Sequence, residues 1–172
     1  MRYSVKLFVL FTLLSCSSVR VNYDYEEAAD FSNYHTYNYY SDMNTGLSEL
    51  DTRRLLTSLD GQMKLKGIRF SEDPDFLINI ESRLIPSPNS TSIGLGVGGT
   101  GRNVGGGISV GIPVGQSNIE RQIFFDLIDS HSNALFWQAV SEDSFKENIS
   151  PEKREEHLQA LVAKVFSKYP PK

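Results

Sequence analysis

The chain has 172 residues, of which 40% are hydrophobic and 22% are charged, and its formal net charge is −4 at pH 7. This length suits one domain, which can bury a sufficient core without disulfides or a metal ion. The mildly acidic balance, without a basic cluster, argues against nucleic-acid binding. We therefore expect a single domain whose partners do not include nucleic acid.

The N-terminus has the pattern of a bacterial export signal. A basic start, MRYSVK, precedes the apolar run LFVLFTLL, which is far shorter than the roughly 20 residues needed to span a bilayer. The next segment, Leu13–Cys16, resembles the lipobox, in which the signal is cut before a cysteine that becomes acylated. Cys16 is the only cysteine of the chain and cannot form an internal disulfide. We expect Cys16 to be the lipidation site; the alternative is an ordinary signal peptide with a chance cysteine.

These features predict the domain organisation and the location of the protein. We expect a lipoprotein signal peptide at 1–15, a lipidated tether at 16–22 and a single domain at 23–172. Two or three acyl chains on Cys16 would attach the protein stably to a membrane. No run of acidic residues follows the cysteine, which by resemblance to bacterial sorting rules favours the periplasmic face of the outer membrane, within the cell envelope.

The first half of the predicted domain contains strands and one helix. Aromatic residues recur at about every second position within 19–40, which predicts two short strands around a turn near 26–33. These tyrosines are interpreted either as half-buried strand faces or as a ligand-stacking belt. Ser48 is a typical N-cap and Gly67 a typical C-terminal residue, so a helix is expected between them. Alternating apolar residues predict a strand over 75–84.

The C-terminal part predicts a hairpin and a second helix. Two apolar runs, at 124–128 and 134–140, flank a polar turn at 129–133. Ser150 and Pro151 begin a helix. Its apolar residues fall on one stripe: Leu158, Leu161, Val162, Val165, Phe166 and Tyr169. This order of elements favours an α+β fold, in which a mostly antiparallel sheet of about five to seven strands carries two helices on one face.

Several motifs, taken in order, resemble one family. They are Asp24-Tyr25, Asp30-Phe31, Tyr34 and Tyr37 after the lipobox, then Leu65–Ile68, Asp73–Ile78, Phe125–Ser130, Leu135–Ala139 and Tyr169–Pro171. The chain is similar to the bacterial lipoprotein family catalogued as domain of unknown function four-one-three-six, and the match covers nearly the whole mature chain. The resemblance implies a lipoprotein of the cell envelope, and it implies no activity because the family has none assigned.

The segment 93–115 holds most of the glycines of the chain. It contains the glycine spacing of a dinucleotide-binding loop but not the strand, helix and acidic residue that such a loop requires. Its apolar residues alternate with small ones, which predicts a Gly-rich hairpin with one bare face. This hairpin is either a poorly ordered extension of the sheet or a docking surface for a partner. The candidate interaction residues on it are Gly94, Gly96, Gly98, Ile108, Val110 and Ile112.

The sequence lacks a convincing catalytic or metal-binding set. A nucleophile and an oriented base must lie together, whereas the three histidines are scattered and no serine occupies a nucleophile elbow. Asp126, Asp129 and His131 come nearest to a metal site, but the strand and turn assignments separate them. Trp137 is interpreted as a core residue or as a ligand platform, and it joins the candidate interaction residues. We expect no catalytic residue, no metal, no cofactor and no enzymatic activity.

Two functions remain open from the sequence. The first is a non-catalytic envelope lipoprotein that acts as a binding or structural interaction module, whose sheet edge or hairpin contacts an envelope protein or peptidoglycan. The second is a carrier or binder of a small apolar or lipid ligand, held in an aromatic-lined pocket. A closed aromatic cavity would favour the second function, and a filled core with an exposed sheet edge would favour the first.

Overall fold

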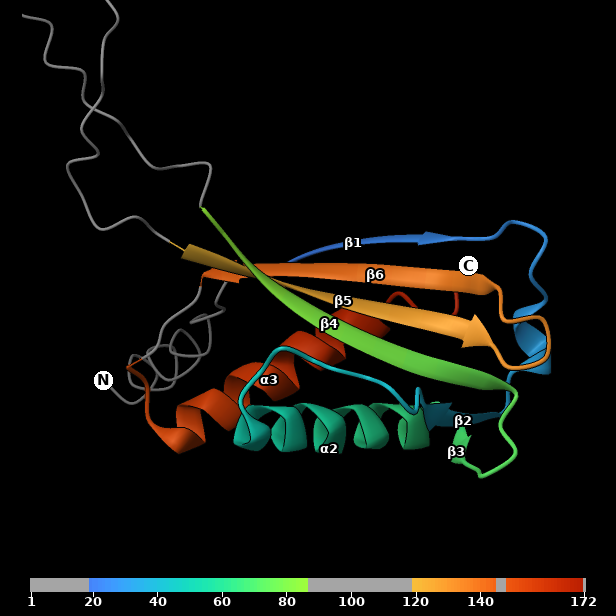
Figure 1. Cartoon of the computed structure of the whole chain (residues 1–172), viewed down its shortest axis with the longest axis horizontal. Helices are drawn as coiled ribbons and strands as arrows, with labels where there is room; N and C mark the ends of the chain where they lie inside the picture. Colours follow the sequence, from blue (N-terminus) through green and yellow to red (C-terminus); the bar gives the residue numbers. More distant parts are fainter. Residues whose placement is uncertain (1–18, 87–118, 145–147, 172) are drawn as a thin grey trace, which may run out of the picture.

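The computed structural model describes residues 19–86, 119–144 and 148–171, and these form one sheet with helices on one side (Figure 1). The order of the strands is β1-β6-β5-β4-β2-β3. β2 runs parallel to β3 and β4, and the other neighbours are antiparallel. The predicted α+β class and mostly antiparallel sheet are thus confirmed. The strand bounds are β1 Arg20–Tyr25, β2 Thr36–Tyr39, β3 Arg69–Phe70, β4 Phe76–Pro86, β5 Ile119–Asp129 and β6 Leu135–Ser144.

Two α-helices, α2 (Glu49–Leu65) and α3 (Pro151–Phe166), lie on the same face of the sheet, as predicted (Figure 1). Each begins at the serine expected from the sequence. The hydroxyl of Ser48 accepts a hydrogen bond from the backbone N–H of Asp51, and that of Ser150 accepts one from the N–H of Lys153. These bonds satisfy donors that the first turn of a helix leaves open. A short 3-10 helix, η1 (Phe31–Asn33), separates β1 from β2.

The core lies between the sheet and the two helices. Every second residue of the central strands points towards the helices, as strand geometry requires. The side chains of Phe76, Ile78 and Ile80 on β4 and of Phe125 and Leu127 on β5 are fully buried there. The helices contribute one apolar stripe each. These stripes consist of Leu55, Leu59 and Met63 on α2 and Leu158, Leu161, Val162, Val165 and Phe166 on α3.

A β-bulge alters the simple alternation on β6. The pairing of β5 with β6 shifts register after Leu127, so that Leu127 lies opposite Trp137 but Ile128 lies opposite Leu135. Phe136 is the extra residue, and a bulge re-aims the side chains around it. Two consecutive aromatic residues, Phe136 and Trp137, are therefore both buried, which the period-two pattern of the sequence does not indicate.

The folded part begins earlier than expected. β1 starts at Arg20, inside the segment 16–22 that we predicted to be a tether, and Val19 before it is 4% exposed. The reason is that Val19 and Val21 continue the alternation of the strand and pack against the core. Cys16, the signal peptide and the predicted hairpin at 93–115 lie outside the described residues. All strands and helices named above lie within 19–171.

Candidate functional site

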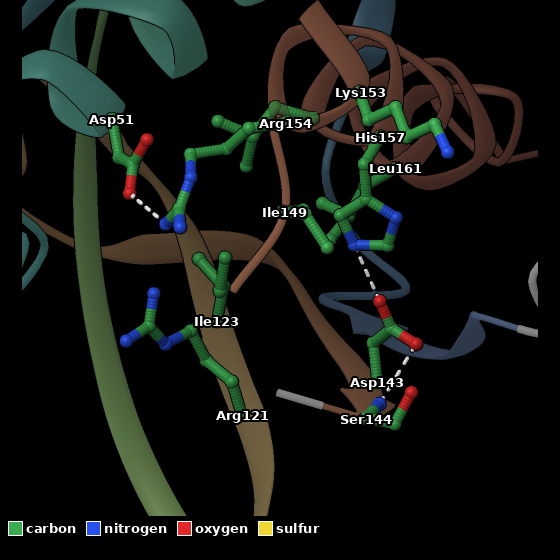
Figure 2. Close-up of a pocket in the computed structure, with 11 residues that line it drawn as sticks. Asp51, Arg121, Ile123, Asp143, Ser144, Ile149, Lys153, Arg154, His157 and Leu161 are labelled. Carbon is green, nitrogen blue, oxygen red and sulfur yellow. Dashed lines mark hydrogen bonds and ion pairs between the residues drawn. The ribbon is translucent and has the colours of Figure 1, made fainter. Parts of the chain in front are cut away.

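A charged pocket lies under one end of the sheet, between the starts of both helices and strands β5 and β6 (Figure 2). Its volume is about 200 Å³. Three cationic side chains, two carboxylates and one imidazole line it: Arg121, Lys153, Arg154, Asp51, Asp143 and His157. These charges surround the pocket in a chain whose overall net charge is −4. We use the name charged pocket for these residues together with the apolar wall formed by Ile123, Ile149, Leu158 and Leu161.

Asp51 joins the two helices at the pocket. It is the third residue of α2, and its side chain is 7% exposed. One carboxylate oxygen accepts a hydrogen bond from Arg54 at 2.9 Å, and the other accepts one from Arg154 of α3, also at 2.9 Å (Figure 2). A buried carboxylate requires such partners because its desolvation is costly. The start of α2 is therefore fixed against the start of α3 by a charge-assisted contact.

His157 and Asp143 join α3 to β6 on another side of the same pocket. The imidazole Nε2 lies 2.5 Å from the Asp143 carboxylate oxygen Oδ2, and the Asp143 side chain is 8% exposed (Figure 2). The other oxygen of Asp143 accepts the backbone N–H of Ser144 at 2.8 Å. The two atoms are close enough to form an ion pair, which links α3 to β6. Among the described residues, no hydrogen bond joins this imidazole to a serine or threonine hydroxyl.

The back of the charged pocket is apolar. Ile123 of β5 and Leu158 and Leu161 of α3 form this wall together with Ile149, which precedes the helix. Both helices begin at the pocket, and the N-terminus of a helix carries a partial positive charge. The site therefore combines three cationic side chains and two helix N-termini with an apolar wall, which suits a ligand that has an anionic group and a few adjoining carbon atoms.

A second candidate surface is the outer edge of β1, which is an end strand of the described sheet. The N–H of Glu26 donates to the carbonyl of Phe136 on β6, so by alternation the backbone groups of Val21 and Tyr23 point away from the sheet. At both ends of this edge, side chains already bond to the backbone groups. Lys164 donates to the carbonyl of Val19, and the Asp24 carboxylate accepts the N–H of Tyr25 at 2.9 Å.

The aromatic residues are packed against one another. Trp137 is 0% exposed, and its ring centroid lies 5.6 Å from that of Phe166 and 5.4 Å from that of Tyr169. Burial raises the pKa of Tyr169. Trp137 is thus a core residue, and its ring offers no surface to a partner, which corrects its place among the candidate interaction residues. Most of the described aromatic residues pack into a filled core, whereas Tyr23 and Tyr25 on β1 and Phe70 on β3 remain exposed.

Other predicted site residues are separated, as their strand and turn positions require. The amide of Gln138 donates to Asp126, whereas Asp129 accepts the N–H groups of His131 and Ser132 in the hairpin turn. No group of three or more His, Cys, Asp and Glu side chains in the described part of the chain is arranged to hold a metal ion. Cys16 and the glycine-rich residues Gly94, Gly96, Gly98, Ile108, Val110 and Ile112 lie outside the described residues.

The sequence reading missed the charged pocket. The sequence pattern alone does not single out Asp51, Asp143 or His157 as members of one site. Two signals were present. Asp143 has the strand parity of the buried Ala139 and Ser141, and Asp51 lies four residues before Leu55 on the buried stripe of α2. An acidic residue on an otherwise buried face indicates a partner or a site.

Comparison with protein families decides the relationship of this chain. A family model described as "Domain of unknown function (DUF4136)" matches residues 21–171. The chain belongs to the DUF4136 family. The resemblance inferred from the motifs is thus confirmed at the level of the domain. No curated protein matches the sequence of this DUF4136 chain.

Solved structures resemble the DUF4136 domain at low sequence identity. A PDZ domain protein from Parabacteroides distasonis matches with a TM-score of 0.59 and 15% identity, over 99% of this chain and 40% of that one. The DUF4136 chain thus spans less than half the length of that protein. The PelC dodecamer from Paraburkholderia phytofirmans, in two crystal forms, gives a TM-score of 0.49 with 12% and 11% identity, over 87% of this chain and 95% of that one. None of the described helices is long and apolar enough to cross a membrane.

Proposed function

We propose that the protein is an envelope lipoprotein, anchored through acyl chains on Cys16, whose domain is a non-catalytic module that binds an extended segment of another envelope protein along β1. The observation that carries this proposal is the outer edge of β1, where Val21 and Tyr23 direct backbone donors and acceptors away from the sheet. An extended peptide can add a strand to such an edge. The filled aromatic core favours this function over that of a carrier.

The surroundings of β1 support a peptide partner. The rings of Tyr23 and Tyr25 are 43% and 38% exposed and stack on each other with centroids 6.4 Å apart. A hollow of about 210 Å³ lies beside Tyr25, Glu26 and Leu135. In strand addition the main chain supplies affinity, and hollows that accept alternate side chains supply specificity. The edge of β1 offers both.

The position of the anchor also supports this surface. Cys16 precedes Val19 by three residues, and three extended residues reach at most roughly 11 Å. An acylated Cys16 would therefore hold the start of β1 close to the membrane surface, where other anchored proteins lie. Mass spectrometry of the protein from its native membrane tests the anchor. A peptide that begins at an acylated Cys16 is expected, and an unmodified Cys16 would exclude the anchor.

Proline substitution tests the role of the β1 edge. Tyr23→Pro removes an outward N–H that makes no bond within the sheet, and proline is tolerated at such edge positions. With a photo-cross-linking residue at Tyr25 in cells, we expect the original chain to give a cross-link to an envelope protein and the proline variant to lose it. Circular dichroism should show the same fold for both.

Two matched variants control this experiment. Tyr23→Ala removes the ring but keeps the N–H, so it should retain the cross-link if backbone pairing carries the contact. Asn22→Pro removes an N–H on the β6 side of β1 and should destabilise the sheet, which verifies the assigned direction of the backbone groups. A cross-link that Tyr23→Pro leaves unchanged would exclude strand addition at β1.

A further inference from the structure

The charged pocket has the electrostatics of an anion site. Arg121, Lys153 and Arg154 outnumber the carboxylates Asp51 and Asp143. Both carboxylates are already engaged with cationic or N–H donors from the protein, at 2.9 Å to Arg154 and at 2.5 Å to His157. A guanidinium has five N–H donors in a rigid fork, so an arginine can contact more than one oxygen-bearing group at once.

The N-termini of the two helices add partial positive charge to that of the cationic side chains. Lys153 and Arg154 are the third and fourth residues of α3, and Asp51 is the third of α2, so both positive helix ends meet at the pocket. Oxygen-rich anions bind where backbone dipoles and cationic side chains converge. The charge of Asp51 is shared between Arg54 and Arg154.

The size and the apolar floor restrict the class of ligand. The pocket volume of about 200 Å³ is several times the ~30 Å³ that one water molecule occupies in the liquid. Ile123, Ile149, Leu158 and Leu161 form one wall of it. This space suits a tetrahedral phosphate together with the carbon atoms esterified to it, because the phosphate meets the cations while the carbons meet the apolar wall.

The pocket also lies close to the start of β1, and so to the proposed anchor. Lys164 of α3 donates to the carbonyl of Val19, and it lies one turn beyond Leu161 of the pocket wall. Arg20 on β1 lies opposite Glu142 on β6, and Glu142 is next to the pocket residue Asp143. A chain acylated at Cys16 would therefore hold the pocket near the phosphate layer of the bilayer.

We propose that the charged pocket binds the phosphate group of an anionic phospholipid headgroup, with Lys153, Arg154 and Arg121 as the cationic contacts. The source of the phosphate, a lipid rather than a free ion, rests on the proposed lipid anchor. The affinity of the pocket for phosphate does not rest on it.

The test uses the chain from Ser17 onwards, which keeps every described strand and helix, and compares Lys153→Glu with Lys168→Glu. Both replace an exposed lysine near one end of α3 by glutamate, but only Lys153 lines the pocket. Lys153→Glu should preserve the fold, because glutamate at this position completes a capping box with Ser150. One arm titrates inorganic phosphate and follows the NMR signals of His157. The other arm measures sedimentation with vesicles of phosphatidylglycerol or of phosphatidylcholine.

We expect phosphate to shift the His157 signals, and Lys153→Glu to weaken binding roughly 10-fold or more, as the loss of a charge-assisted contact does. Phosphatidylglycerol vesicles should bind the parent chain and Lys168→Glu, and Lys153→Glu should bind them roughly 10-fold more weakly. Equal weakening by both lysine variants would overturn the pocket, since it would indicate unspecific attraction. Phosphate binding without vesicle binding would overturn the lipid source, and no response in either arm would overturn the proposal.

These outcomes are separate from those of the proposed function. Acylation of Cys16 and cross-linking at β1 are measured on the full chain in its membrane, whereas both arms above use a chain without Cys16. A β1 cross-link that Tyr23→Pro leaves unchanged, together with intact phosphate binding, would therefore contradict the proposed role of the β1 edge alone. If the β1 cross-link behaves as expected but phosphate does not bind, only the proposal for the charged pocket is contradicted.

Discussion

Asp129 organises the turn between β5 and β6 by itself. Its Oδ1 accepts the N–H groups of His131 and Ser132 at 3.0 and 2.7 Å, and its Oδ2 accepts the hydroxyl of Tyr34 at 3.1 Å. The hydrogen bond from the Ser132 backbone is the main cause that lowers the pKa of Asp129. Burial, and then the bond to this carboxylate, raise the pKa of Tyr34 to about 12. The ionised carboxylate therefore contributes to stability.

The variant Asp129→Asn tests this contribution through pH. The lowered pKa means that the charged form stabilises the fold above the unfolded pKa of about 3.9, and that this is lost as pH falls through the lower folded value. At pH 7 we expect the variant to be less stable by about 1 kcal/mol at most, because solvent screens a partly exposed carboxylate. Urea unfolding at pH 7, 4 and 2.5 should show the difference disappear. A difference that is the same at all three values would contradict this role.

At the scale of elements, the helix starts carry much of the specification of the fold. The α2 start requires Ser48, whose hydroxyl lies 3.2 Å from the N–H of Asp51. Removing an N-cap costs about 1 kcal/mol. We expect Ser48→Ala to lower the free energy of unfolding by this amount and Ser48→Asp to restore it. Thr57→Ala, an exposed change within the same helix, should be neutral or slightly stabilising, and an equal loss in both alanine variants would exclude a specific capping effect.

Helices and strands of this fold could be predicted where a local sequence pattern specifies them. Caps at Ser48 and Ser150 predicted the helices, and alternation predicted β4. The partners of the strands were not readable, because β1 pairs with β6 more than 100 residues later, and no local pattern selects a distant partner. The extra residue at Phe136 was hidden for a similar reason, since a bulge is a property of two strands together.

The charged pocket shows the same limit for a site. Its charged residues come from α2, β5, β6 and α3, and no local sequence pattern groups them. Only the topology brings Asp51, Asp143 and His157 to one end of the core. The edge of β1 was predicted in general terms as an exposed sheet edge, although the strand itself could not be identified as the outer one.

At the scale of the whole molecule, the contact of Asp51 with Arg154 links the starts of the two helices that lie on the sheet. The residues are 103 positions apart, and their side chains are 7% and 23% exposed. Both helices begin at this corner, so their positive ends lie near each other, and a carboxylate between them offsets that repulsion.

A double-mutant cycle on Asp51→Ala and Arg154→Ala measures this coupling. An exposed ion pair contributes about 0–1 kcal/mol and loss of one partner from a fully buried pair costs about 3–5 kcal/mol, so this half-buried pair should show a coupling of about 1–2 kcal/mol. Arg54 stays bound to Asp51 in Arg154→Ala, which keeps the buried carboxylate partnered and the fold intact. The control cycle uses Glu49 and Arg53, whose side chains are 88% and 69% exposed and should couple by about 0.5 kcal/mol or less. Because little solvent reaches Asp51, the first coupling should persist in 0.5 M salt while the second fades. Equal couplings in the two cycles would mean that apolar packing, and not the ion pair, holds the helix starts together.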